Sequence, residues 1–263
     1  MFHDANGQLP PARTRWRGLT WAARLLPYLE QTAAFEEFDF TKDYWDQPEA
    51  ARMHTPSVFF CPTRRGPMVS KQGDAPNQRA PAPTTHPGSC SDYTGNGGHQ
   101  EFGPDHWLCC NEGVYGQRTS ATGTLITARY FGADKYYHVS FAEIRDGLSN
   151  TLLLGEKHVH PDWLGHYYVG DAPSQATEAS NDQSIYIGHW GFSCVVGPGF
   201  PIIRDPRQPK GLMPHFGSWH PGVCQFALAD GSVRAISVSV SETVMGNLAQ
   251  RSSGEVISAD AFQ

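Results

Sequence analysis

The chain has 263 residues, of which 17% are charged and 12% aromatic, with 27 glycines and 20 prolines. This composition is typical of a loop-rich, β-leaning globular protein and argues against a helical bundle or a disordered chain. A formal net charge of −6 with scattered lysines and arginines gives no basic stripe for nucleic acid, and no run of 18 apolar residues is present to cross a membrane. We expect one domain over residues 1–263.

The first third of the chain predicts short elements. Apolar residues at helical spacing over residues 19–40, interrupted by Pro27, predict a turn of helix followed by a second helix that begins near the proline. Residues 46–54 predict another short helix, and residues 57–62 a buried strand. Residues from about 63 to 124 are rich in Pro, Gly, Ser and Asn, which predicts a loop-rich insertion.

The segment from Ser140 onward carries the clearest local signals. Ser140 and Glu143 form a capping box, and Gly147 is placed to end a two-turn helix. Asp146, Gly147 and Asn150 are therefore interpreted as a structural helix end and turn, from which a strand leads on. Further strands are expected within residues 184–196, and a C-terminal helix after Ser241. Short helices beside a mainly antiparallel sheet predict the α+β class.

Residues 220–237, "HPGVCQFALADGSVRAIS", predict a β-hairpin. Asp230-Gly231 suits a two-residue type I′ turn, which sets Leu228 opposite Val233, Phe226 opposite Ala235 and Cys224 opposite Ser237. His220 then lies at the open end of the hairpin. A single histidine there is more typical of a capping or hydrogen-bonding group than of a catalyst, so we interpret His220, Asp230 and Gly231 as architecture.

A second histidine-rich stretch, "GEKHVHPDWLGH", is the strongest candidate for chemistry. If the strand continues, Glu156, His158 and His160 alternate onto one face, with Asp162 and His166 just beyond. Two histidines and a carboxylate can bind zinc or another divalent ion. The competing interpretation is a set of solvated histidines at a sheet edge. No other cofactor is predicted, and no established catalytic motif occurs.

Six cysteines occur without any CxxC spacing. This argues against structural zinc and favours an exported protein with one to three disulfides, although six cysteines allow fifteen connectivities. The six are Cys61, Cys90, Cys109, Cys110, Cys194 and Cys224.

Seven motifs in order resemble one family. They are "FHDANGQLPPAR", "WAARLLPYLEQ", "FFCPTRRG", "DYTGNGG", "IRDGLSNTLLLGEK", the His220-x9-Asp230-Gly231 spacing and "LAQRSSGEVIS". Together they resemble the planctomycete type IV pilin-like proteins of unknown function, also labelled a bacterial solute-binding protein family. The resemblance implies a pilin-like head, with an N-terminal helix on an antiparallel sheet, and an anchor helix ahead of residue 2 that this chain lacks.

Two functions follow as expectations. The resemblance implies a non-enzymatic, extracytoplasmic, pseudopilin-like subunit associated with type II secretion, anchored to the cell envelope by that helix. Its partners would be other pilin-like or secretion-system proteins, or envelope glycans, and not nucleic acid. The alternative is a ligand- or metal-binding head with hydrolytic activity.

Overall fold

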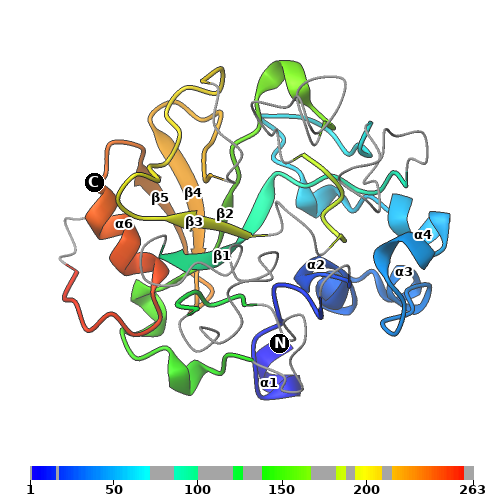
Figure 1. The fold of residues 1–263 in the computed structure, drawn as a ribbon, viewed down its shortest axis with the longest axis horizontal. Helices are drawn as coiled ribbons and strands as arrows, with labels where there is room; N and C mark the ends of the chain where they lie inside the picture. Colours follow the sequence, from blue (N-terminus) through cyan, green and yellow to red (C-terminus); the bar gives the residue numbers. More distant parts are fainter. Residues whose placement is uncertain are drawn as a thin grey trace, which may run out of the picture.

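The structure is a computed structural model that shows the α+β fold expected from the sequence (Figure 1). Part of the expected insertion, with Cys109 and Cys110, lies outside the described residues. The structure describes residues 2–15, 18–71, 86–99, 121–126, 138–166, 182–187, 193–208 and 215–257.

A five-stranded sheet in the order β3-β1-β2-β4-β5 forms the centre of the molecule. The pairs β1–β2, β2–β4 and β4–β5 are antiparallel, while β3 runs parallel to β1 at one edge. The strands are β1 (Tyr93–His99), β2 (Leu152–Glu156), β3 (Ser193–Val196), β4 (Val223–Leu228) and β5 (Val233–Ser237).

The helices are short. The C-terminal α6 packs on the sheet beside β1, β2 and β3, and α2, α3 and α4 gather on the other side of the molecule (Figure 1). No helix in the described ranges is long and apolar enough to cross a membrane. The α-helices are α1 (Phe2–Asn6), α2 (Trp21–Leu25), α3 (Thr32–Glu36), α4 (Glu49–Met53) and α6 (Glu242–Ala249). The 3-10 turns are η1 (Leu26–Leu29), η2 (Tyr44–Asp46), η3 (Ser57–Phe59), η5 (Phe141–Glu143), η6 (Leu148–Asn150) and η7 (Pro161–Trp163).

Several local predictions are confirmed and others are wrong. Pro27 lies in the first turn of η1, where α2 has ended, and Ser241 is the N-cap residue of α6. The strand expected over residues 57–62 is instead η3, because the backbone N–H of Phe59 bonds back to the carbonyl of Pro56.

The two-turn helix expected after Ser140 is the single turn η5. Glu143 accepts a hydrogen bond from the Ser140 backbone N–H at 2.8 Å, as the capping box predicts, but the chain leaves helical geometry at Ile144. Gly147 has the expected positive φ of 95°. Asp146 accepts hydrogen bonds from the backbone N–H groups of Ser253 and Gly254, so this turn also holds the C-terminal segment.

Two hydrophobic clusters stabilise the fold. The first packs the helical side of the molecule around Trp21, Tyr44 and Phe59. The second lies between the sheet and α6 and includes Phe226 and Leu248. Gly155 of β2 permits the tight packing of the second cluster, since a Cβ there would lie 2.5 Å from the Phe226 ring.

The predicted hairpin is present, but its register is displaced by one residue. Ala227 pairs with Val233 and Cys224 with Ile236, so the expected pairs Leu228–Val233, Phe226–Ala235 and Cys224–Ser237 are wrong. The N–H of Gly231 donates to the carbonyl of Leu228, and the N–H of Leu228 donates to the carbonyl of Ser232. These two hydrogen bonds close a three-residue loop over residues 229–231.

The loop chemistry explains the displacement. Gly231 has φ of 85°, whereas Asp230 has no positive φ, so the loop is a type I turn followed by a left-handed glycine and not a type I′ turn. The extra loop residue reverses the faces of β5, which buries Ile236 completely and leaves Val233 68% exposed.

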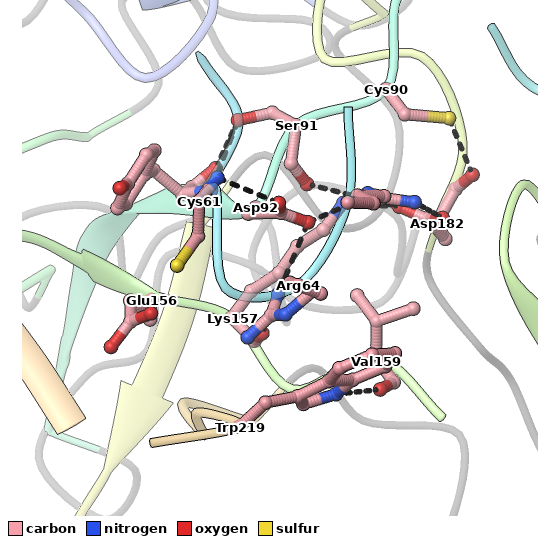
Figure 2. Close-up of polar contacts among 12 residues, drawn as sticks. Cys61, Arg64, Cys90, Ser91, Asp92, Glu156, Lys157, Val159, Asp182 and Trp219 are labelled. Atoms are coloured by element: carbon pink, nitrogen blue, oxygen red, sulfur yellow. Dashed lines mark hydrogen bonds and ion pairs between the residues drawn. The ribbon is translucent and has the colours of Figure 1, made fainter. Parts of the chain in front are cut away.

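A buried network of charges joins four segments of the chain (Figure 2). Asp92 binds Arg64 at 3.2 Å and Arg65 at 2.7 Å, and Asp182 binds Arg65 and, at 3.2 Å, Lys157. All five side chains are at most 5% exposed. We call this set the ion network.

Backbone groups complete the ion network. Arg64 donates to the carbonyls of Lys157 at 2.8 Å and Gly217 at 3.1 Å. Burial opposes ionisation of Asp182, but the charges of Arg65 and Lys157 and the hydrogen bonds from Arg65 and the Gly165 N–H outweigh it and hold the pKa of this carboxyl well below its usual value. Asp182 is therefore ionised at neutral pH.

We expect Gly231→Val to lower the free energy of unfolding by about 1 to 3 kcal/mol, because valine resists a positive φ. No atom lies within 4 Å of the added Cβ, so the cost is backbone strain and not a clash. Asp230→Asn is the matched control, since its amide oxygen can still accept from the Ser232 N–H. Urea unfolding of both variants measures the difference, and equal midpoints would contradict the turn assignment.

Asp182→Asn is expected to destabilise the fold by about 3 to 5 kcal/mol, because it leaves two buried cations without their shared carboxylate. Asp162→Asn is the control: its pair with Arg207 is more than 60% exposed on both sides, and the midpoint should barely change. Denaturant unfolding compares the two.

The pH dependence gives the ion-network prediction a second measurement. The pKa of Asp182 is lower in the folded protein than its value of about 4 in the unfolded chain, so its ionised carboxylate stabilises the fold above that pH. This stabilisation is lost as the pH falls. The difference between wild type and Asp182→Asn should therefore shrink in acid. A difference that is constant from pH 7 to pH 3 would show that the charge of Asp182 is not what stabilises the fold.

Candidate metal centre

Three side chains that are distant in the sequence converge at one point. The Sγ of Cys61 lies 3.4 Å from Nε2 of His220, and Oε1 of Glu156 lies 3.6 Å from the same nitrogen. The three ligand atoms are all within 4.8 Å of one another, and no other group of three such residues occurs in the described part of the chain. We call this group the Cys-Glu-His site.

Glu156 is the buried side of the site. It is the last residue of β2, lies opposite Tyr93 of the neighbouring strand β1, and is only 1% exposed. Its Oε2 accepts from the backbone N–H of Gln225 at 2.8 Å. Its Oε1 is buried without a hydrogen-bond partner and faces His220 and Cys61. A buried carboxylate oxygen without a hydrogen bond is costly, and a cation beside it would offset that cost.

The ion network positions Cys61. The backbone N–H of Cys61 donates to Oδ2 of Asp92 at 2.9 Å, and the Cys61 carbonyl accepts from the N–H groups of Arg64 and Arg65 (Figure 2). The "CPTRR" segment thus folds into a turn that places the thiol beside Glu156 and both guanidinium groups beside Asp92.

His220 forms the partly open side of the site, with 28% of its side chain exposed. Its backbone N–H donates to the Ser218 hydroxyl at 3.0 Å. The neighbouring Trp219 donates its indole N–H to the Val159 carbonyl at 3.1 Å, and its ring lies over the guanidinium group of Arg64 (Figure 2). The loop before β4 is therefore fixed at the residues that immediately precede His220.

The pKa values of two neighbouring groups are raised by burial and by the acidic groups of the site. Burial, together with the nearby Cys61 and Glu156, raises the pKa of Tyr93 to about 12, so its phenol stays protonated. Burial and then Glu156 raise the pKa of the Cys224 thiol well above its usual value. Cys224, which donates to the Glu156 carbonyl at 3.7 Å, therefore behaves as an inert buried thiol.

The predicted ligand set of Glu156, His158 and His160 is not brought together. The Nε2 atoms of His158 and His160 lie within hydrogen-bond distance of the carbonyls of Gln208 and Arg207, at 3.1 and 3.0 Å. The Nδ1 of His160 also accepts from the Asp162 N–H. Both rings thus hold the loop around residue 207, and only Glu156 belongs to the convergent site.

The disulfides expected from the cysteine count are absent among the described cysteines. Cys61, Cys90, Cys194 and Cys224 are all buried free thiols, and Cys109 and Cys110 lie outside the described residues. Each of the four has other surroundings: Cys61 faces His220, Cys90 donates to the Asp182 carbonyl at 3.4 Å, and Cys194 and Cys224 pack in the second hydrophobic cluster.

Sequence reasoning missed Cys61 as a ligand and gave His220 only an architectural role. The signal was present in the motifs: "FFCPTRRG", "LLLGEK" and the His220 spacing each supply one member of the site. Distance along the chain concealed it, because 95 residues separate Cys61 from Glu156 and 64 separate Glu156 from His220.

Comparison with known proteins places the chain in a family. The sequence profile of SBP_bac_10, described as "Protein of unknown function (DUF1559)", matches residues 1–243. Neither a curated protein nor a solved structure matches the chain. Because the profile covers nearly the whole chain, the protein belongs to the DUF1559 family.

Proposed function

We propose that this protein binds a divalent transition-metal ion, with zinc the best fit, through Cys61, Glu156 and His220. The observation that carries the proposal is Oε1 of Glu156, which is buried without a hydrogen-bond partner and faces both other ligands. A metal ion would satisfy this oxygen and use the thiolate, carboxylate and imidazole donors that zinc prefers.

The distances fit tetrahedral coordination. With zinc bonded to sulfur at about 2.3 Å and to nitrogen or oxygen at about 2.0 Å, neighbouring ligand atoms lie about 3.3 to 3.6 Å apart. The Cys61–His220 and Glu156–His220 distances of 3.4 and 3.6 Å fall on this range. The third distance, between the ligand atoms of Cys61 and Glu156, is at most 4.8 Å.

A nucleophilic cysteine is the alternative use of these residues, and the geometry argues against it. In a nucleophile–base–acid chain, the carboxylate bonds the ring nitrogen that faces away from the nucleophile. Here both Cys61 and Glu156 approach Nε2. Convergence on one nitrogen suits ligands around an ion and not a proton relay.

A second proposal concerns where the metal-binding head is displayed. We infer a non-enzymatic, extracytoplasmic, pilin-like role in secretion or in glycan or protein contact, supported by the sequence resemblance and by the way the N-terminal motif is attached. The His3 ring stacks on Phe141 with centroids 3.6 Å apart and accepts from the Phe141 N–H, while the Leu9 N–H bonds to the Val139 carbonyl. A preceding anchor would thus join a firmly held segment.

The display proposal is tested on the native gene product in intact cells. We expect added proteinase K to digest the head without cell lysis, together with an outer-surface marker. Protection of the head until the cytoplasmic membrane is disrupted, with the outer membrane already permeabilised, would contradict extracytoplasmic display and leave the metal proposal intact.

The metal proposal predicts one equivalent of zinc after dialysis, measured by elemental analysis, and loss of that equivalent in Cys61→Ser, Glu156→Gln and His220→Ala. His160→Ala is the matched control, because this histidine lies in the same histidine-rich stretch but bonds the Arg207 carbonyl. Full zinc retention in His220→Ala would contradict the proposed site.

Zinc should also raise the thermal midpoint of the wild-type protein. Free zinc at 100 times its dissociation constant adds about 2.7 kcal/mol of stability if it binds only the folded state. Cys61→Ser should show no such shift. An equal shift in both proteins would place the zinc elsewhere.

A further inference from the structure

One buried side chain, that of Arg64, contacts three other segments of the chain around the Cys-Glu-His site (Figure 2). Its Nη1 lies 3.2 Å from Oδ1 of Asp92 and donates to the Lys157 carbonyl at 2.8 Å. Its Nη2 donates to the Gly217 carbonyl at 3.1 Å, and the guanidinium carbon lies 5.8 Å from the centre of the Trp219 ring. The side chain is completely inaccessible to solvent, so these contacts are made away from water.

The contacts with Asp92 and Lys157 position the first two ligands. The second oxygen of Asp92 accepts the backbone N–H of Cys61 at 2.9 Å, and the backbone N–H of Arg64 donates to the Cys61 carbonyl at 2.8 Å. Lys157 follows Glu156 directly, and its N–H donates to the Asp92 carbonyl at 2.9 Å. Arg64 therefore fixes the backbone of the thiol ligand relative to the backbone of the carboxylate ligand.

The contacts with Gly217 and Trp219 position the third ligand. Arg64 binds the carbonyl of Gly217, and the N–H of Gly217 donates to the Glu156 carbonyl at 2.9 Å. The Trp219 ring packs over the guanidinium group and directly precedes His220 in the chain. The loop that carries the imidazole ligand is thus held by the same side chain as the other two ligands.

We propose, resting on the metal site above, that Arg64 is the positioning residue of the Cys-Glu-His site and holds its three ligands together before the ion arrives. The planar guanidinium group donates in several fixed directions at once, which suits it to bind a carboxylate and two carbonyls. As a cation, Arg64 acts only through the ligands. Loss of a group that orients metal ligands weakens metal binding about 10- to 100-fold.

Arg65 provides a comparison within the same ion network. It also binds Asp92, at 2.7 Å, and it donates to Asp182 at 2.8 Å. Among the described residues, its side-chain hydrogen bonds reach neither the segment of the carboxylate ligand nor the loop of the imidazole ligand. Arg65 thus resembles Arg64 in charge and burial but lacks its contacts with two of the three ligand segments.

The test compares Arg64→Lys with the matched control Arg65→Lys. Lysine keeps the positive charge but replaces the planar fork by a single ammonium group, which cannot bind all of these partners. Zinc affinity is measured by competition with a chromogenic chelator, at a temperature where circular dichroism shows both variants to be folded. We expect the zinc dissociation constant to rise about 10-fold or more in Arg64→Lys and less than about 3-fold in Arg65→Lys.

Cobalt(II) in place of zinc gives a second measurement, of ligand geometry. Its d–d absorption bands depend on the arrangement of the ligand atoms, and a general loss of stability does not shift them while the protein remains folded. We expect altered bands in Arg64→Lys and wild-type bands in Arg65→Lys.

A second pair of variants, Arg64→Met and Arg65→Met, is used if Arg64→Lys does not fold. Without Arg64, the two cations and two carboxylates that remain in the ion network balance in charge. Wild-type affinity and cobalt bands in the Arg64 variant, or an equal loss in both arginine variants, would overturn this inference and leave the metal proposal standing. Failure of the wild-type protein to bind zinc would overturn the metal proposal, and this inference with it.

Discussion

The ion network around Asp92 and Asp182 is the interaction on which the rest of the structure depends. Two carboxylates and three cations, all nearly inaccessible to solvent, fasten the turn after Cys61 to the start of β1, the end of β2 and the segment at residue 182. Each charge is costly to bury alone and tolerable only with its partners. The five residues therefore hold one arrangement, which specifies how these segments meet.

That arrangement fixes the Cys-Glu-His site. One carboxylate oxygen of Asp92 receives the Cys61 N–H, and the other receives Arg64 and Arg65, so the thiol is positioned by the residue that anchors the charges. Arg64 also bonds the carbonyl of Lys157, next to Glu156. The guanidinium group of Arg64 thus links Cys61, through Asp92, to the chain beside Glu156. A small shift of the ion network would move both residues together.

The sequence allowed the fold class and many local elements to be predicted, because these depend on short-range chemistry. The positive φ of Gly147, the N-cap at Ser241 and the presence of the final hairpin follow from residue types over a few positions. The hairpin register did not follow, because Asp-Gly suits both a two-residue and a three-residue loop. The three-residue loop turns Ile236 toward the second hydrophobic cluster, where it is fully buried. This packing involves distant residues and cannot be predicted from the hairpin sequence alone.

The Cys-Glu-His site could be predicted only in part, for a related reason. The alternation along β2 identifies Glu156 as a candidate. It does not show that His158 and His160 bond to the backbone carbonyls of Gln208 and Arg207, because the position of that distant loop cannot be predicted from the local sequence. Cys61 and His220 approach Glu156 only through the ion network and the pairing of β2 with β4.

The His-x9-Asp-Gly spacing now divides into two separable roles at opposite ends of β4. Asp230 and Gly231 form the loop that sets the hairpin register, and His220 precedes the other end of the strand. Between them, β4 donates the Gln225 N–H to Glu156. The loop sets the register of β5, the edge strand, whereas the pairing of β4 with β2 places the Gln225 N–H beside Glu156, so the turn and the site are held by different contacts of the same strand.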